Sequence, residues 1–278
     1  MLSKRKRILL SLGLVMVMLV LSACGNTAPI TSESTGFWDG VVIYNFSRFI
    51  IFLSELFNNN YGVGIIIFTA IIRVILIPLN YFQTKSTQKM QKVQPQIKEL
   101  QEKYASKDTQ TRELLQAEIS RVYSDNGVNP YAGCLPAVVQ MPVMIALYQA
   151  ISRTEVLSEG SFLWMNLGES DPYFILPVLA AILTFFTTKL TTMSQPQGGG
   201  QAKAMMYTMP AMILFVGISL PSALSLYWVV SNAFSVGQTL IMNNPYKIIS
   251  EREAEERAQK ERAKALEKAK KPKKKRRK

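Results

Sequence analysis

Five stretches of this 278-residue chain are apolar over about twenty residues each, and this block pattern restricts the fold more than any other feature. About 20 apolar residues in a helix span the hydrocarbon core of a bilayer, where only helices and closed barrels satisfy their own backbone hydrogen bonds. The pattern therefore predicts an all-α membrane protein with five transmembrane helices. The blocks cover residues 61–83, 131–152, 172–190, 204–221 and 222–243.

The first 23 residues have the pattern of a lipoprotein signal peptide. Four basic residues at 4–7 precede an apolar run at 8–21, which is short for a membrane span. The run leads into the letters LSAC at 21–24, a lipobox whose last residue, Cys24, receives a lipid. The alternative is a signal anchor with an incidental cysteine. The lipobox predicts a bacterial cell-membrane protein that is lipid-anchored at Cys24 on the outer face.

Charges between the apolar blocks predict how the spans are oriented. Residues 84–130 carry eight Lys and Arg, and 15 of the chain's 32 Lys and Arg follow Asn244. Residues 153–171 instead hold one Arg and four acids. Under the positive-inside rule, the 84–130 segment, the 191–203 loop and the 244–278 tail are cytoplasmic, and the 153–171 loop is extracellular. The C-terminus is therefore expected in the cytoplasm.

An external N-terminus requires that residues 37–57 do not cross the membrane. This stretch is apolar but contains Asp39, Arg48 and Glu55. We therefore expect residues 24–60 to form a lipidated N-terminus followed by an amphipathic helix on the outer interface. The 84–130 segment has two runs with helical spacing, around Leu100 and Leu114, separated by a Lys-Asp-Thr break at 107–109. It is predicted to be a cytoplasmic helical hairpin.

Arg73 lies about eleven residues into the first span. Its cost there runs from about 2.5–3.5 kcal/mol on insertion scales to about 10–17 kcal/mol in simulations. No Asp or Glu occurs in any of the five predicted spans, so a buried ion pair does not explain it. An arginine that snorkels to the interface is the alternative. Its depth instead favours a guanidinium that is solvated inside a hydrophilic groove.

Neutral polar residues of several spans support such a groove. Thr69 is one helical turn before Arg73, and Asn80 extends the same face. Polar residues also recur along the last span, and Gln140 sits in the second. A plain helix-packing role is the alternative for such stripes, above all for the third span. The last-span residues are Ser225, Trp228, Asn232, Ser235 and Thr239, and the third-span residues are Thr184, Thr187, Thr188 and Thr191.

The composition argues against an enzyme. There is no histidine, which removes the commonest general base and metal ligand. The glycines at 198–200 lack the Lys-Ser/Thr that completes a phosphate-binding loop. No cofactor or metal is therefore expected. A small multi-spanning transporter or an oligomeric channel remains the alternative class. Transporters usually show internal repeats and ionisable pairs, and neither is visible in this sequence.

Three groups of motifs carry a resemblance to a known family. The letters YAGCLP at 131–136, QMP at 140–142 and ALY at 146–148 are similar to one core span of the YidC/Oxa/Alb insertases. The letters LYWVVSN at 226–232 resemble the last span of that family, and Thr69, Arg73 and Pro78-Leu79 resemble the first. With the lipobox and basic tail, the chain resembles the Gram-positive lipoprotein type.

The resemblance implies a membrane protein insertase and chaperone. Such a protein inserts and helps fold newly synthesised membrane proteins, alone or with the Sec translocon. It further implies ribosome binding by the basic tail, and the signal-recognition-particle receptor and anionic lipids as other partners. The substrate groove residues would be Arg73, Thr69, Gln140, Trp228 and Asn232.

Overall fold

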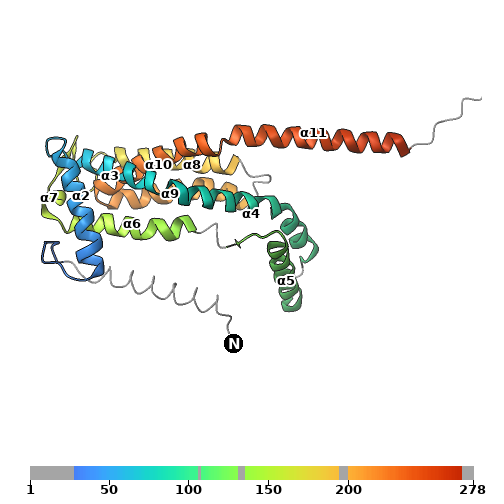
Figure 1. The fold of residues 1–278 in the computed structure, drawn as a ribbon, viewed down its shortest axis with the longest axis horizontal. Helices are drawn as coiled ribbons and strands as arrows, with labels where there is room; N and C mark the ends of the chain where they lie inside the picture. The colour runs from blue at the N-terminus through green and yellow to red at the C-terminus, as the bar shows by residue number, and fades with distance from the viewer. Residues whose placement is uncertain (1–27, 106–107, 131–134, 194–199, 271–278) are drawn as a thin grey trace, which may run out of the picture.

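The computed structural model describes residues 28–105, 108–130, 135–193 and 200–270, and these are almost entirely helical. A bundle of helices forms the body of the molecule (Figure 1). Helix α10 is its centre, because it contacts each of the other bundle helices. The bundle comprises α3 (Tyr61–Ile75), α6 (Leu135–Ser152), α8 (Ile175–Met193), α9 (Gly200–Ser219) and α10 (Ser222–Met242).

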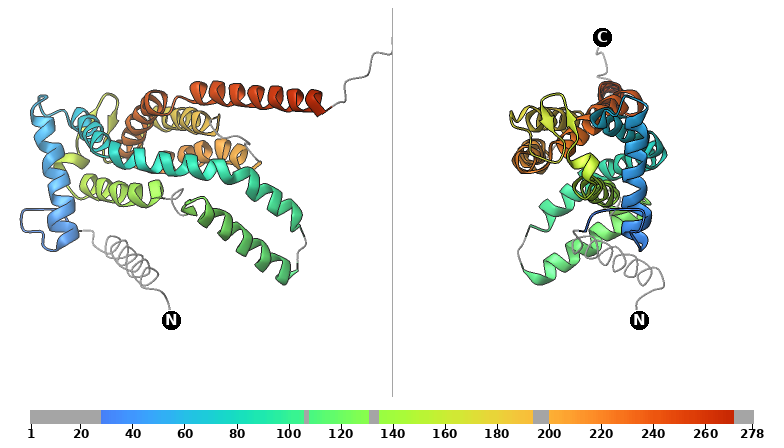
Figure 2. Two further views of the ribbon diagram at one scale, coloured as in Figure 1. Left: turned by 45° about the vertical axis from the view of Figure 1, so that its right-hand side comes forward. Right: turned by 90° about the vertical axis from the view of Figure 1, so that its left-hand side faces the viewer.

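One end of the bundle is covered by short elements. A π-helix, η1 (Phe37–Ile43), continues into α2 (Tyr44–Glu55), which lies crosswise to the bundle (Figure 2). The connection from α6 to α8 adds α7 (Glu155–Ser158) and the antiparallel strands β1 (Ser161–Phe162) and β2 (Met165–Asn166). The all-helical prediction is therefore right except for this small hairpin, which packs on α3.

Two long helices extend from the opposite end. Helix α4 (Ile77–Lys103) turns back through α5 (Thr109–Asp125), and α11 (Pro245–Lys270) extends away from the bundle (Figure 1). Val93, Ile97 and Val128 form a small core of their own, with further residues of α5 packed against it. The helical hairpin predicted for residues 84–130 corresponds to α5 and the greater part of α4, while Lys107 of the predicted break lies outside the described residues.

The first predicted span differs from the structure in where it is interrupted. Helix α3 ends at Ile75, and α4 begins at Ile77 with its axis bent by 55°. Pro78 lies in the first turn of α4, where its missing N–H leaves no helical hydrogen bond unmade. Helix α4 runs through residues 83 and 84 without a break, so the predicted end of the first span at 83 does not coincide with the end of a helix and stays a prediction. The polar residues that follow Phe82 still favour a helix, so hydropathy changes there but backbone conformation does not.

The number of membrane spans remains a prediction. In the described part of the chain, α8 alone is both long and apolar enough to cross a membrane, and the bent α3–α4 pair passes the same criteria together. The apolar parts of α6 and α9 are shorter, at Val138–Ser152 and Ala204–Ser219. Helix α10 has 21 residues, a length of about 30 Å. Its Ser, Asn, Gln and Thr side chains lower its hydropathy.

The main hydrophobic core occupies the end of the bundle that α2 and α7 cover. Phe68 of α3, Leu147 of α6, Leu157 of α7 and Tyr227 of α10 are at most 2% exposed and belong to one cluster. The first half of α10 is buried, whereas its residues from Asn232 onward are partly or fully exposed. The bundle is therefore tightly packed at one end and more open at the other.

A buried ion pair ties the N-terminal segment to α6. The Arg153 guanidinium donates to both carboxylate oxygens of Asp39, at 3.0 and 2.7 Å, and to the Ala28 carbonyl at 2.8 Å. Both side chains are largely buried, at 7% and 16% exposure. Gln149 accepts from Arg153 and from the Trp38 indole. The sequence shows Asp39 and Arg153 only as charges of two separate segments, because nothing local signals a pair 114 residues apart.

Gly64 allows α2 and α3 to approach closely. A Cβ at this position would clash with Ser54 Oγ and lie 2.9 Å from the Ile50 carbonyl oxygen. Ser54 Oγ itself donates to that carbonyl at 2.7 Å, so rotating it away from the new methyl group would break this hydrogen bond. The crosswise placement of α2 therefore depends on a glycine in the first turn of α3.

We predict that Gly64→Ala destabilises the folded protein by about 1–3 kcal/mol, because the methyl group overpacks this contact. Thermal unfolding of the purified chain in detergent measures the effect as a lower melting temperature. Gly237→Ala in α10 is the matched control, since a Cβ there meets no atom within 4 Å. A Gly64→Ala protein that melts with the Gly237→Ala control would contradict the close approach.

Candidate functional site

Arg73 lies in the last turn of α3, two residues before the helix ends. It forms no hydrogen bond or ion pair with any residue that the structure describes. The carbonyl end of a helix stabilises a cation by about 0.3–1 kcal/mol. That is less than the lowest cost of an arginine in hydrocarbon, about 2.5–3.5 kcal/mol. The helix end alone therefore does not account for Arg73, and water, lipid phosphate or neutral polar groups are needed to offset the rest.

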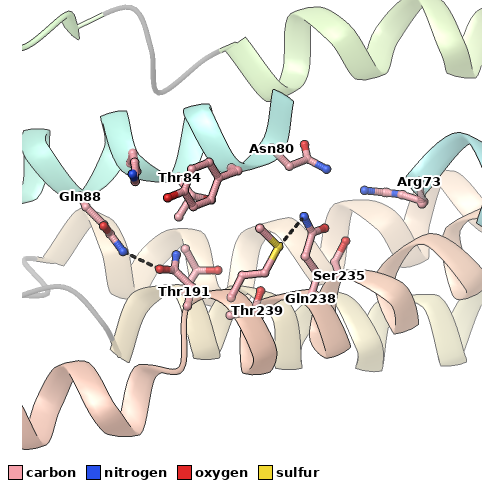
Figure 3. Close-up of a pocket in the computed structure, with 12 residues that line it drawn as sticks. Arg73, Asn80, Thr84, Gln88, Thr191, Ser235, Gln238 and Thr239 are labelled. Atoms are coloured by element: carbon pink, nitrogen blue, oxygen red, sulfur yellow. Dashed lines mark hydrogen bonds between the residues drawn. The ribbon is translucent and has the colours of Figure 1, made fainter. Parts of the chain in front are cut away.

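A polar cavity beside Arg73 can hold that water. It has a volume of about 460 Å³, many times the roughly 30 Å³ of one water molecule. In Figure 3 Arg73 points along the cavity toward Asn80, between α4 on one side and α10 on the other. Every lining residue except Met242 carries a polar or charged group. They are Arg73, Asn80, Tyr81, Thr84, Lys85, Gln88, Thr191, Ser235, Gln238, Thr239, Met242 and Asn243.

A hydrogen bond marks the far end of this cavity. Gln88 of α4 donates to the side-chain oxygen of Asn243, the residue that follows α10. Gln88 also lines a second cavity of about 740 Å³, whose walls come from α4 and α11. Polar surface therefore continues from Arg73, past Gln88, to the acidic and basic side chains of α11. The charged side chains of the second cavity are Glu251, Arg252, Glu255 and Glu256 of α11 and Lys92 of α4.

Of the five groove residues proposed from the sequence, Arg73 is the one that lines the described cavity. Thr69 is fully buried, and its hydroxyl donates to the Ile65 carbonyl of its own helix at 2.7 Å. Asn232 is half-buried and donates to the Trp228 carbonyl at 2.9 Å. In this conformation Thr69 and Asn232 bond within their own helices, and their contact with substrate stays a prediction.

Gln140 and Trp228 join α6 to α10. The Gln140 amide donates to the Tyr227 hydroxyl, and the Trp228 indole donates to Met144 Sδ at 3.2 Å. Trp228 is 8% exposed and belongs to the main core. These two cross-helix contacts place both side chains just inside the packed half of the bundle. Their proposed role in a substrate path likewise remains a prediction.

Asn80 was expected on the same face as Arg73, but the lining residues Thr84 and Gln88 were missed because the first span was expected to end at 83. Asn80, Thr84 and Gln88 follow one another at four-residue spacing, so they share one face of α4. This four-residue spacing is visible in the sequence once the helix is continued past Phe82. Ser235, Thr239 and Thr191 were recognised as members of polar stripes, and the structure brings all three into the same cavity as Arg73.

Comparisons with known proteins decide the family. The model of the family described as 60Kd inner membrane protein matches residues 52–251. An Enterococcus faecalis protein named membrane protein insertase YidC is 57% identical over 272 residues, covering 98% of each chain. The chain belongs to the YidC insertase family. A Pediococcus pentosaceus protein of the same name is 54% identical over 250 residues, or 89% of each chain.

A solved structure agrees with this assignment. The active YidC insertase crystal structure with its first transmembrane domain resolved matches with a TM-score of 0.59 and 29% identity. The match covers 80% of this chain and 49% of that one, so the present chain spans about half of the solved protein. The family resemblance seen in the motifs is confirmed, and with it the expectation of a membrane protein insertase in the cell membrane.

We predict that the cavity is accessible to water in the membrane. Cysteines introduced at Ser235 and Thr239, which line it, should react several-fold faster with a membrane-impermeant maleimide applied to both membrane faces, because the thiolate forms in water. Phe186→Cys is the control. Phe186 is 48% exposed but does not line the cavity, and α8 and α10 start from the same end of the bundle.

The experiment uses a Cys134→Ser parent and is read by mass shift after a fixed labelling time. Equal labelling at Ser235, Thr239 and Phe186 would argue against a hydrated cavity.

Proposed function

We propose that this insertase carries polar segments of newly made membrane proteins part-way across the bilayer through the cavity beside Arg73. The observation that carries the proposal is an unpaired guanidinium facing a 460 Å³ space with polar walls. A charge that is solvated but not paired attracts an anion without holding it permanently. Acidic residues in a short N-terminal tail or loop of the substrate are the groups that it would attract.

The two ends of the bundle differ, and this difference indicates how the cavity is oriented in the membrane. The packed core, α7 and the β1–β2 hairpin close one end, and the acidic 153–171 loop lies there. The basic helices α4 and α11 leave from the other end, toward which the cavity extends. By the positive-inside rule we assign that end to the cytoplasm. The groove is then reached from the cytoplasm and sealed outside, with five spans and η1–α2 at the outer interface.

Driving force comes from the apolar part of the substrate. Hydrated walls shorten the roughly 30 Å of hydrocarbon that a polar segment must pass. Exposed apolar side chains on neighbouring helices, such as Phe186 on α8 and Phe215 on α9, offer the adjoining hydrophobic segment a path into lipid. Burial of apolar surface, at about 25 cal/mol per Å², then supplies the free energy without a nucleotide.

The lipid anchor at Cys24 belongs to the same proposal. Cys24 lies outside the described residues, and its support is the lipobox together with the orientation of the first described residues. Ile30 N–H donates to the Arg153 carbonyl at 2.8 Å, which holds this segment at the end assigned to the outer face.

We predict that Arg73→Ala lowers insertion of a substrate with acidic translocated residues by about tenfold or more, since a hydrogen bond to a charged group contributes about 1.5–3 kcal/mol. Arg73→Lys should retain most of the activity because it keeps the charge. Protease protection of a radiolabelled substrate in reconstituted vesicles measures insertion. The Ala variant should insert the same substrate almost normally when its acidic residues are replaced by Asn and Gln. Equal activity of Arg73→Ala on the acidic substrate would refute the attraction mechanism.

For the C-terminal tail we propose ribosome binding. Residues 270–278 contain eight Lys and Arg, and α11 presents mixed charges in exposed, weak pairs such as Arg257–Glu253. Ribosomal RNA offers a dense array of phosphates, and neutralising them makes binding strongly dependent on salt. Anionic lipid is the competing partner, at about 1 kcal/mol per basic residue near the surface.

We predict that replacing the basic residues of 270–278 with Gln lowers co-sedimentation with ribosomes at low salt. At high salt the unmodified chain should lose the same binding. Both samples are kept in a neutral detergent, so that lipid charge plays no part. Undiminished co-sedimentation of the Gln variant at low salt would assign the tail to lipid instead.

A further inference from the structure

The cavity that contains Arg73 contains a second cation, Lys85. Lys85 lies on α4, nine residues after the break at Leu76, which is roughly 13 Å farther along at 1.5 Å per residue. It is exposed, whereas Arg73 is partly buried. Among the lining residues that the structure describes there is no Asp or Glu, so the two cations set the charge of the whole cavity.

An aromatic ring holds Lys85 in place. Its ammonium nitrogen lies 4.4 Å from the centre of the Tyr81 ring, one turn earlier on α4, and Tyr81 also lines the cavity. A cation over an aromatic face is attracted to the ring without losing its net charge. Within the described residues Lys85 has no carboxylate partner, in contrast to Lys98 of the same helix, which pairs with Glu102 at 3.9 Å.

Neutral polar groups fill the interval between the two cations. Asn80 and Thr84 both line the cavity and lie between Arg73 and Lys85 along the chain. Figure 3 shows their side chains on the wall formed by α4. They can donate hydrogen bonds to a passing carboxylate, but they carry no charge that would retain it. Lys89, one turn beyond Lys85 and also exposed, does not line this cavity.

We propose that Lys85 is the capture residue of the groove: it attracts acidic residues of the substrate at the cavity's cytoplasmic mouth and passes them on to Arg73. This rests on the proposed function and adds a specificity-determining residue to it. The two cations differ in their surroundings. An exposed charge acts through water over about 10 Å at 0.1 M salt and about 3 Å at 1 M, whereas a partly buried one is screened much less. Capture by Lys85 is therefore sensitive to salt, and attraction by Arg73 is less so.

The test uses the full chain reconstituted in vesicles of phosphatidylcholine, which carries no net charge. Two versions of a small substrate are compared, one with acidic residues in its translocated tail and one with the corresponding amides. The variants are Lys85→Gln, Lys85→Arg and, as matched control, Lys89→Gln. Initial insertion rates are measured by protease protection at salt concentrations of about 0.05 M and about 0.5 M.

We expect Lys85→Gln to slow the acidic substrate about three- to tenfold at low salt and to have little effect at high salt. The amide substrate should insert at the parent rate, Lys85→Arg should restore the acidic one, and Lys89→Gln should match the parent. If Lys85→Gln matches Lys89→Gln at low salt, the inference is overturned. Equal slowing of both substrates overturns it too, since that result shows a structural role.

Arg73→Ala in the same assay separates this inference from the proposed function. If Arg73→Ala inserts the acidic substrate slowly while Lys85→Gln inserts it at the parent rate, the proposed function is supported and the capture role of Lys85 is overturned. If Arg73→Ala inserts the acidic substrate at the parent rate, the proposed function itself is overturned.

Discussion

An unpaired guanidinium in an apolar bundle has to be hydrated, and this requirement shapes the rest of the molecule. The described part of the chain offers Arg73 no carboxylate, and the end of α3 offsets only a small part of its cost. On the proposed function, water reaches the residue through the polar cavity, and a uniformly packed bundle would keep that water out. The helices meet the requirement by packing closely over one half of their length and separating over the other.

Helix α10 contributes to both the packed half and the open half of the bundle. Its first half contributes Tyr227 and Trp228 to the main core, and its second half contributes Ser235 and Thr239 to the cavity. Arg73 lies two residues before α3 ends and lines the same cavity as this second half, and α4 follows at a bend of 55°. The bend is what lets α4 form a wall of the cavity, because a straight continuation of α3 would run in a different direction.

Local sequence was sufficient for features that depend on local physics. The apolar blocks located the bundle helices, and the cost of a charge in lipid identified Arg73. Features that depend on distant contacts were missed. Asp39 and Arg153 pair across 114 residues, and Thr69 turned out to be buried against its own helix. The bend at Leu76 was missed for another reason, since hydropathy continues through Pro78 while the backbone changes direction.

The Arg153–Asp39 ion pair also determines where a pull on the N-terminal segment is transmitted in the protein. The chain at Ala28 and Ile30 is held by Arg153, the residue that directly follows α6. A pull on the residues ahead of Ala28 is therefore transmitted to α6 and η1. Because η1 continues into α2, and α2 packs closely on α3 at Gly64, such a pull also reaches the helix that carries Arg73.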